Sequence, residues 1–262
     1  MILRLCIYGL VFLMYGALGK AMGDELPSVH RIENWEEAFN NGDWQARYGL
    51  VDSLYKLPHQ PWPEPLRELL LKIAEWDMTR IDSMRNAYDA NGNLKYQVEG
   101  FSHDSRETFA GNLKKLVVSQ EDKRFVPFLA GRLGGGMLTV RGLAAIGEPA
   151  FDSLIAASYR DGWSSQADAA RALGLILAKR QNFLERNEQK RETAKRALLH
   201  VVRAPEHNHR IRAINALVYI PDAEVTALLD SLSQYDNYED RKGRYRVREK
   251  AQEALQRLRG NR

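Results

Sequence analysis

Hydrophobic residues recur every three to four positions from Asn34 onward, as they do in amphipathic helices. Leu50, Leu54 and Leu57, for example, share one helical face. No run of alternating β-branched residues, the usual sign of a strand, occurs along the chain. The pattern predicts an all-α protein with twelve helices, at about residues 34–41, 42–57, 64–88, 103–118, 122–133, 137–146, 148–160, 163–180, 187–204, 207–219, 222–234 and 243–259.

Proline and glycine mark the ends of several of these helices. Pro63, Pro149 and Pro221 lie at or beside predicted helix starts, where a missing backbone N–H is tolerated. Residues 134–136 are three consecutive glycines between two predicted helices. We interpret them as a tight turn rather than a phosphate-binding loop, because no strand precedes them and no Gly-Lys-Ser/Thr follows.

A repeated pattern marks the second helix of several predicted pairs. A small or apolar residue is followed by arginine, then by small residues, and then by Ala-Leu. It reads V-R-E-K-A-Q-E-A-L in residues 247–255 and H-R-I-R-A-I-N-A-L in residues 209–217, whereas residues 165–173 read S-Q-A-D-A-A-R-A-L. The alanines allow neighbouring helices to approach closely. A single pair cannot bury its apolar face alone, so the pattern favours a stack of pairs.

These residues resemble HEAT repeats. The sequence A-I-G-E-P-A-F at residues 145–151 is similar to the bacterial HEAT-like subtype first named from phycobiliprotein lyases. The resemblance implies a right-handed α-solenoid (α-α superhelix) of about six helix pairs over residues 34–259. It also implies a ladder in which arginines of second helices pair with aspartates of neighbouring repeats, interrupted where Gln166 replaces arginine. The matching ladder positions are Arg47, Arg106, Arg210 and Arg248.

The sequence predicts three segments. Residues 1–23 have the layout of a secretory signal peptide: Arg4, then fifteen uncharged residues, then small residues. We expect cleavage after Gly23, or alternatively after Gly19, and a periplasmic or secreted protein. The run is short for a transmembrane helix, which needs about 20 apolar residues, but an uncleaved N-terminal anchor is the alternative. Residues 24–102, where the repeat spacing is irregular, form N-terminal helical repeats or a cap, and residues 103–262 form the HEAT-like solenoid.

Composition narrows the functional classes. The chain has 262 residues, of which 44% are apolar and 27% charged, as in a folded globular protein. Its single cysteine, Cys6, lies in the predicted signal, which excludes a disulfide framework or a thiolate zinc site in the mature chain. Residues 24–174 carry a net charge of −5 and residues 175–262 one of +7. This asymmetry indicates either two differently solvated helical faces or a basic surface for an acidic partner.

Five residues are the predicted contacts for a partner. Trp62 lies between prolines in H-Q-P-W-P-E-P, so we expect it off a helix and exposed, as an anchor for a partner or a lid over the core. The basic C-terminal part supplies the other four, which are Arg210, Arg212, Arg244 and Arg246.

Other chemistry has weaker support. Histidine is a common metal ligand, and His207 and His209 could reach one metal ion, with His200 seven residues before His207. No third ligand lies at a set spacing from this pair, so no metal site is predicted. The run His103-Asp104-Ser105 cannot form a triad from adjacent positions, and we interpret it as a helix start. Residues 241–250 contain six basic residues and a tyrosine, but they overlap the repeat pattern, and nucleic-acid binding is not predicted.

The leading hypothesis is therefore an exported, non-enzymatic scaffold without a cofactor. Its expected partner is a protein or peptide, with an acidic one as the first candidate, and no membrane contact is expected beyond an N-terminal anchor. The resemblance leaves open an enzyme-associated alternative, a bilin-lyase-like or base-excision-like activity. A structural envelope protein that self-associates is a third class.

Overall fold

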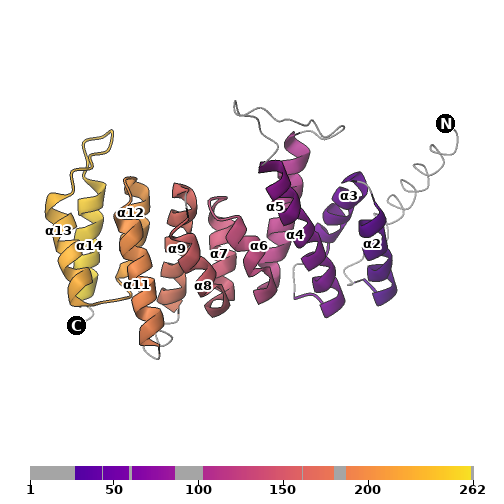
Figure 1. Cartoon of the computed structure of the whole chain (residues 1–262), viewed down its shortest axis with the longest axis horizontal. Helices are drawn as coiled ribbons and strands as arrows, with labels where there is room; N and C mark the ends of the chain where they lie inside the picture. Colours follow the sequence, from indigo (N-terminus) through magenta and orange to yellow (C-terminus); the bar gives the residue numbers. More distant parts are fainter. Residues whose placement is uncertain are drawn as a thin grey trace. The chain divides into compact units, whose positions relative to one another are not determined.

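All regular secondary structure in the part of the chain that the structure describes is helical, and no strand occurs there (Figure 1). The structure is a computed structural model and describes residues 27–42, 44–58, 61–85, 103–160, 162–179 and 187–260. These ranges contain twelve α-helices and two short 3-10 helices. The prediction of an all-α protein is thereby confirmed. The predicted signal peptide, residues 1–23, lies outside the described residues.

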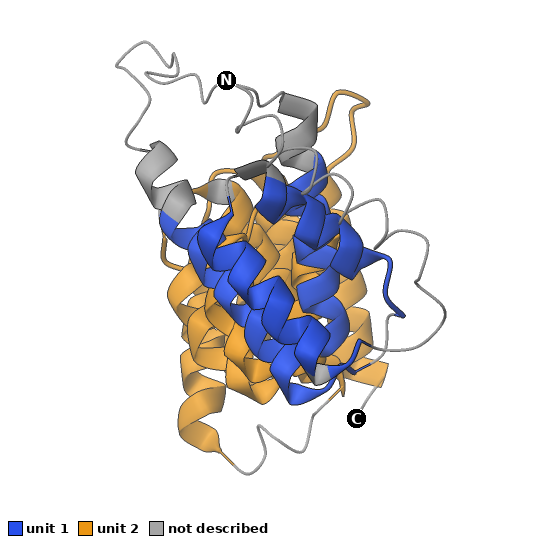
Figure 2. Cartoon of the chain, turned by 90° about the vertical axis from the view of Figure 1, so that its right-hand side faces the viewer, with its two compact units in different colours: residues 1–120 blue, residues 121–262 orange. Residues whose placement is uncertain are grey.

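The chain divides into two compact units, residues 1–120 and residues 121–262 (Figure 2). In unit 1, α2 packs against α3 and α4, and α5 also packs against α3 and α4. Helix α5 therefore belongs to unit 1, whereas the predicted solenoid, residues 103–262, includes it. The bounds of the four helices are α2 Val29–Asn41, α3 Trp44–Tyr55, α4 Glu64–Arg85 and α5 His103–Gln120.

Unit 2 is built of helix pairs in two layers. The second helices α7, α9, α12 and α14 contact one another in sequence, α7 with α9, α9 with α12 and α12 with α14. The first helices α6, α8 and α11 also contact one another in order, and α13 packs against α14. The bounds are α6 Val126–Gly131, α7 Met137–Ile146, α8 Phe151–Ala157, α9 Trp163–Lys179, α11 Glu188–Val202, α12 His207–Leu217, α13 Ala223–Tyr235 and α14 Arg246–Gly260, with short 3-10 helices η1 Lys123–Phe125 and η2 Glu148–Ala150.

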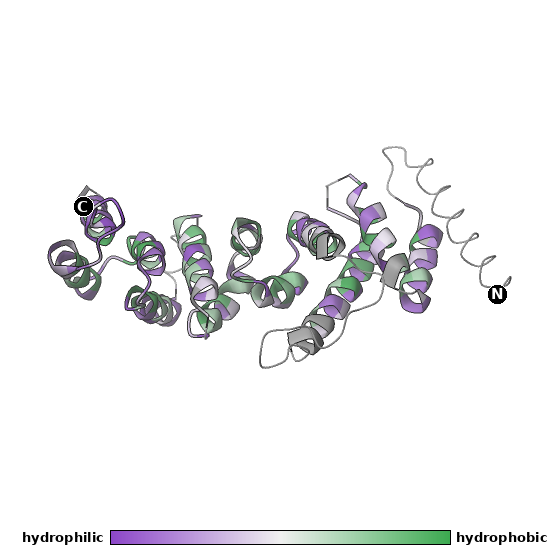
Figure 3. Cartoon of the chain, turned by 90° about the horizontal axis from the view of Figure 1, so that it is seen from above, coloured by the Kyte–Doolittle hydropathy of each residue, from purple (hydrophilic) through white to green (hydrophobic). Residues whose placement is uncertain are grey.

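The core of unit 2 is dominated by small and branched apolar side chains. Ala169, Ala172 and Leu173 of α9 are completely buried, and so are Ala213 and Leu217 of α12. Hydrophobic and hydrophilic residues share each of these helices (Figure 3). The alanines thus have the role expected from the repeated pattern, because a helix without bulky side chains on one face can lie close to its neighbour.

Several helices begin at a side-chain cap. Asp122 accepts a hydrogen bond from the N–H of Arg124 at the start of η1 (3.0 Å), and Asn187 accepts one from the N–H of Lys190 at the start of α11 (3.1 Å). Asp222 caps α13 in the same way. Each cap provides a partner for a backbone N–H that has none inside its helix. Such a cap typically stabilises the protein by about 1 kcal/mol.

The residue at the repeated position caps the end of the preceding helix at the starts of α3, α9 and α14, whereas Arg210 of α12 pairs with the carboxylate of Asp236 instead. Arg47 Nε donates to the carbonyl of Phe39 near the end of α2 (2.9 Å), and Arg248 Nε donates to the carbonyl of Asp236, which follows α13 (2.6 Å). Gln166 Nε2 donates to the carbonyl of Arg160, just beyond α8 (2.9 Å). Backbone carbonyls at a helix end lack partners within the helix, and these side chains supply them.

The glutamine at position 166 therefore continues a structural role of the repeat, although it carries no charge for a ladder. The side chain of Arg106, at a further position of the pattern, lies outside the described residues. In α3 and α14 the arginine of the pattern acts as a helix cap, because it contacts the backbone of its own helix pair.

Candidate binding groove

A groove of about 380 Å³ runs across three consecutive second helices of unit 2. Its volume lies in the range of ligand and peptide sites. On α9 it is lined by Arg171, Gly174, Leu175 and Ala178, at helical positions i, i+3, i+4 and i+7. The spacing shows that one continuous face of α9, adjacent to the buried alanines, forms one side of the groove.

The middle helix, α12, contributes a second face with the same periodicity. Polar and apolar side chains alternate along it, so the floor is amphipathic. Asn208 and Asn215 are exposed and can donate and accept hydrogen bonds, Ile211 is partly exposed, and so is Tyr219, which lies two residues beyond the end of α12. The remaining lining residues are Arg212 and Ala216 of α12 and Arg257 of α14, which completes the opposite side.

Gly174 sets the approach of α9 and α12 beneath the groove. A Cβ atom placed on Gly174 would lie 3.0 Å from Cβ and 3.2 Å from Cα of Ala216, which is tighter than ordinary van der Waals contact. Glycine therefore permits a helix separation that any other residue would widen. The two helices are in direct contact along their length, as the contacts between α9 and α12 show.

The described residues that line the groove include three arginines and no carboxylate. Arg212 Nη1 lies 2.7 Å from Oδ1 of Asp168, and Oδ2 of the same carboxylate accepts a hydrogen bond from the N–H of Gly134 at 3.0 Å. Asp168 is only 5% exposed, so Arg212 is held in place. Arg171 and Arg257 are exposed and have no ion pair or hydrogen bond with another described residue. The groove therefore carries two uncompensated positive charges.

The four arginines predicted as partner contacts lie in different environments. Arg212 lines the groove. Arg210 forms an ion pair with the buried Asp236 of the next helix pair, and Arg244 forms one with Asp240 in the loop before α14 at 3.0 Å. Arg246 is exposed at the start of α14. The structure instead brings Arg212 together with Arg171 and Arg257, neither of which is among the predicted contacts.

Helical spacing is the signal that identifies the missed residues. Arg171 lies within the quoted pattern S-Q-A-D-A-A-R-A-L, between two buried alanines, and Leu175 lies one turn later. A side chain in that position projects beside the face that packs against the neighbouring helix. Arg257 is found only once α14 is known to lie beside α12.

The expected exposure of Trp62 is wrong. Trp62 is 2% exposed and belongs to the core of unit 1. Its Nε1 donates to the carbonyl of Pro58 (3.0 Å), and its backbone N–H donates to Oε1 of Gln120 (2.9 Å). The flanking prolines do keep it off a helix, but an indole buries a large apolar area, and both of its N–H groups have partners inside the unit. It cannot serve as an exposed anchor.

The three histidines weighed as metal ligands lie in different environments, two of them in aromatic contacts. The His207 ring stacks on Tyr238 with centroids 4.0 Å apart, and the His200 ring packs against Tyr159 at 4.8 Å. His209 is 6% exposed, and burial lowers its pKa below the ordinary value, which keeps it neutral at pH 7. Among the described residues, no group of three or more histidines, cysteines or carboxylates is placed to hold a metal ion.

The glycine turn and the basic segment have structural roles. Gly134 and Gly136 have positive φ angles of 91° and 98°, which favour glycine in a tight turn. The basic segment 241–250 surrounds the loop before α14, where the Arg248 guanidinium lies 4.2 Å from the centroid of the Tyr245 ring. The side chains of His103, Asp104 and Ser105 lie outside the described residues.

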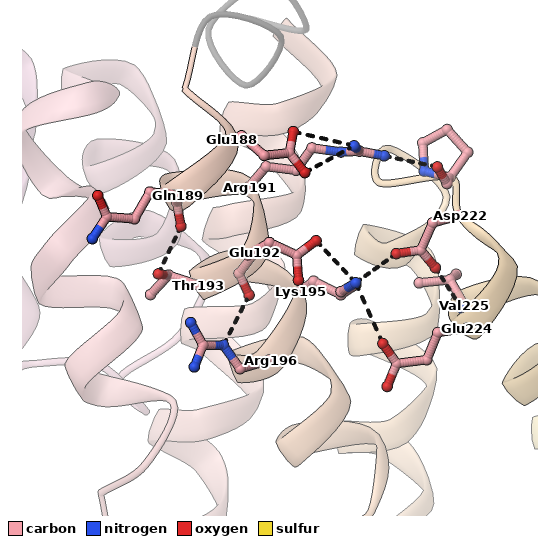
Figure 4. A network of polar contacts seen from close by, with 11 residues as sticks. Glu188, Gln189, Arg191, Glu192, Thr193, Lys195, Arg196, Asp222, Glu224 and Val225 are labelled. Carbon is pink, nitrogen blue, oxygen red and sulfur yellow. Dashed lines mark hydrogen bonds and ion pairs between the residues drawn. The ribbon is translucent and has the colours of Figure 1, made fainter.

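A polar network on the first-helix layer joins α11 to α13 (Figure 4). Lys195 Nζ lies 2.6 Å from Asp222, 2.9 Å from Glu192 and 3.3 Å from Glu224. The hydrogen bonds that Lys195 donates to Asp222 and Glu192 raise the pKa of Lys195 above its ordinary value. Burial alone would raise the pKa of Asp222, but the hydrogen bonds from Lys195 and the Val225 N–H together lower it. The network thus holds charges together rather than presenting a free reactive group.

Replacing Lys195 by methionine is expected to lower the free energy of unfolding by about 1–2 kcal/mol at pH 7, because the carboxylates lose their shared cation but remain partly hydrated. The lowered pKa of Asp222 gives stability that is present above its ordinary pKa of 3.8 and is lost as the pH falls through the lowered value. The raised pKa of Lys195 gives stability that is lost only at pH values above 10.5. Urea unfolding at several pH values measures the difference.

The difference between wild type and K195M should therefore be largest between these limits and shrink in acid. Lys250→Met is the matched control, since Lys250 pairs only with the half-exposed Glu253 three residues away. This control should change stability by less than about 0.5 kcal/mol. A K195M deficit that stayed constant down to about pH 2 would show that the lost packing of the side chain, not its charge, is responsible.

Two further observations bear on function. No described helix is long and apolar enough to cross a membrane. Compared with protein-family models and with curated proteins, the chain matches none.

Proposed function

We propose that this protein is an exported, non-enzymatic scaffold of HEAT-like helix pairs that binds a segment of another protein. In this proposal residues 1–23 are a signal peptide, and the mature protein acts in the periplasm or outside the cell. The helix pairs form a right-handed solenoid of about six repeats, with the second helices as the binding layer.

The groove across α9, α12 and α14 is the observation that carries the proposal. Three consecutive second helices form it, so a ligand that lies across them contacts several repeats at once. It combines an apolar floor with exposed asparagines and arginines, as in surfaces that bind extended segments of proteins. The ion pairs of Arg210 and Arg212 span neighbouring helix pairs, which supports a rigid platform rather than a catalytic cleft.

Site-specific photo-crosslinking in the native cell tests this function. A photoreactive amino acid is placed at Leu175 or Asn215 in the groove, and at Gln189 or Ala227 on exposed positions of the first-helix layer as controls. We expect one and the same protein to be crosslinked from both groove positions and not from the controls. Absence of a protein adduct in the groove, or equal adducts at all four positions, would refute the proposal.

The same tagged chain tests the export part. Cells are fractionated, and the N-terminus of the purified protein is determined by mass spectrometry. A chain that begins near Asp24 in the periplasmic or extracellular fraction is the expected result. An intact chain in the cytosol would contradict export and leave the groove to be assessed against cytosolic proteins.

A further inference from the structure

We propose that the groove selects an acidic peptide that crosses α9, α12 and α14 in an extended conformation. The inference rests on the proposed function and names its partner's chemistry. Its starting point is the charge of the lining, which contains three arginines and no carboxylate. Only Arg212 has a compensating partner, Asp168, so the other two are available to an anion.

Arg171 and Arg257 lie on opposite sides of the groove, with α12 between their helices. Packed helix axes are about 8–10 Å apart, so the axes of α9 and α14 are about 16–20 Å apart. An extended chain advances about 3.3 Å per residue, so about five residues cover this span. A peptide with two acidic residues four to six positions apart therefore matches both guanidinium groups, each of which can bind a carboxylate in a bidentate manner.

The apolar part of the lining specifies the middle of the peptide. Leu175 and Ala178 on the α9 side and Ile211 on α12 present apolar surface, which favours an apolar residue between the acidic ones. Asn208 and Asn215 are exposed beside it and can hydrogen-bond an extended backbone, which offers both N–H and C=O groups. The predicted ligand is thus acidic at both ends and apolar in the centre.

The lining favours a peptide over a single-stranded nucleic acid. Proteins that bind single strands stack successive bases on several aromatic side chains, whereas Tyr219 is the one aromatic residue of this groove. The aliphatic side chains Leu175, Ala178 and Ile211 also offer nothing to a phosphate backbone. Charge alone attracts both ligands, so the combination of two arginines with these aliphatic side chains decides for the peptide.

Fluorescence anisotropy with the mature chain tests the inference. The probes are labelled ten-residue peptides with two glutamates three to seven positions apart and a leucine between them, in a glycine–serine background. The matched peptides carry glutamine in place of glutamate. We expect the best binding at a separation of four to six and at least tenfold weaker binding of the glutamine peptides. Raising the salt concentration should weaken the binding further.

Variants of the groove locate the binding. Arg171→Ala and Arg257→Ala should each weaken the best peptide about tenfold, whereas Arg259→Ala, an exposed arginine of the same helix outside the groove, should leave it unchanged. Because Arg171 and Arg257 are exposed, all three variants should retain the wild-type circular dichroism spectrum and melting temperature.

Four results would overturn the inference. The first is the absence of binding to any glutamate peptide, and the second is equal binding of the glutamine peptides. The third is an equal loss of affinity in R257A and R259A, and the fourth is tighter binding of an oligonucleotide of equal charge. A groove-crosslinked protein whose bound segment is neutral or basic would overturn the acidic specificity while the proposed scaffold function stands. Failure of the crosslinking together with binding of the acidic peptides would refute the protein partner instead.

Discussion

Replacing Asp236 by alanine is expected to destabilise the protein by about 3–5 kcal/mol, the largest effect of any single charge removal in unit 2. The Asp236 side chain is 2% exposed and forms an ion pair with Arg210 of the preceding helix pair. Its Oδ1 also accepts a hydrogen bond from the N–H of Tyr238 at 3.0 Å. The alanine variant leaves the mostly buried Arg210 guanidinium without its anion. Urea-induced unfolding measures the loss.

The matched control is Asp230→Ala in α13, the helix that Asp236 follows. Asp230 is an exposed aspartate of α13 whose side chain contacts only Gln234, at 2.9 Å. Asp230→Ala should lower the free energy of unfolding by less than about 0.5 kcal/mol, since exposed polar contacts contribute little to stability. Asp236→Asn, which keeps the shape and part of the hydrogen bonding, should fall between the two. Equal stability of D236A and D230A would mean that the Arg210–Asp236 pair contributes nothing measurable.

Replacing Gly174 by leucine is expected to lower the free energy of unfolding by about 3 kcal/mol. The same substitution should deform the groove. Already the first carbon of a side chain would lie 3.0 Å from Cβ of Ala216, and leucine adds three more. The contact is with the backbone and the first side-chain atom of α12, so no flexible end can move aside. The two helices must separate or tilt. Urea unfolding and the affinity for the best acidic peptide report the two consequences.

Gly111→Leu is the control for helix propensity. Gly111 is also a glycine within a helix, α5, but a Cβ placed on it meets no atom within 4 Å. Leucine is preferred to glycine in a helix by roughly 0.5–1 kcal/mol, so this variant should be neutral or slightly more stable. If G174L retained full stability and peptide affinity, the close approach of α9 and α12 would have no structural importance.

Much of the helical architecture could be predicted from hydrophobic periodicity and helix-end residues. The helix predicted at residues 137–146 coincides with α7, and the one predicted at 163–180 differs from α9 by one residue. Among the described residues, the first helix, α2, begins at Val29, whereas the first predicted helix begins at Asn34. Ile32 and Trp35 already point into the core on its first two turns, but the preceding serine lacks a side-chain cap hydrogen bond to mark the start.

The groove could be predicted only in part, because its charges are balanced over long distances. Arg212 and Asp168 are 44 residues apart, and Arg210 and Asp236 are 26 apart. Nothing local in the sequence distinguishes these compensated arginines from the uncompensated Arg171. Trp62 shows the converse: flanking prolines indicate where the backbone leaves a helix, but whether an indole is exposed depends on residues as distant as Gln120.

The capping role of the repeated side chain has a consequence for how such a protein can grow. Arg47, Gln166 and Arg248 each bind a backbone carbonyl of their own helix pair, and every pair offers such carbonyls whatever its side chains are. A gene segment that encodes one pair therefore carries its own helix cap when it is duplicated. The ion pairs between neighbouring pairs do not travel in this way, since Arg210 and Asp236 lie in different segments. A new copy of a helix pair would therefore carry its helix cap from the start. The ion pairs that connect it to its neighbours would arise by later substitutions in both segments.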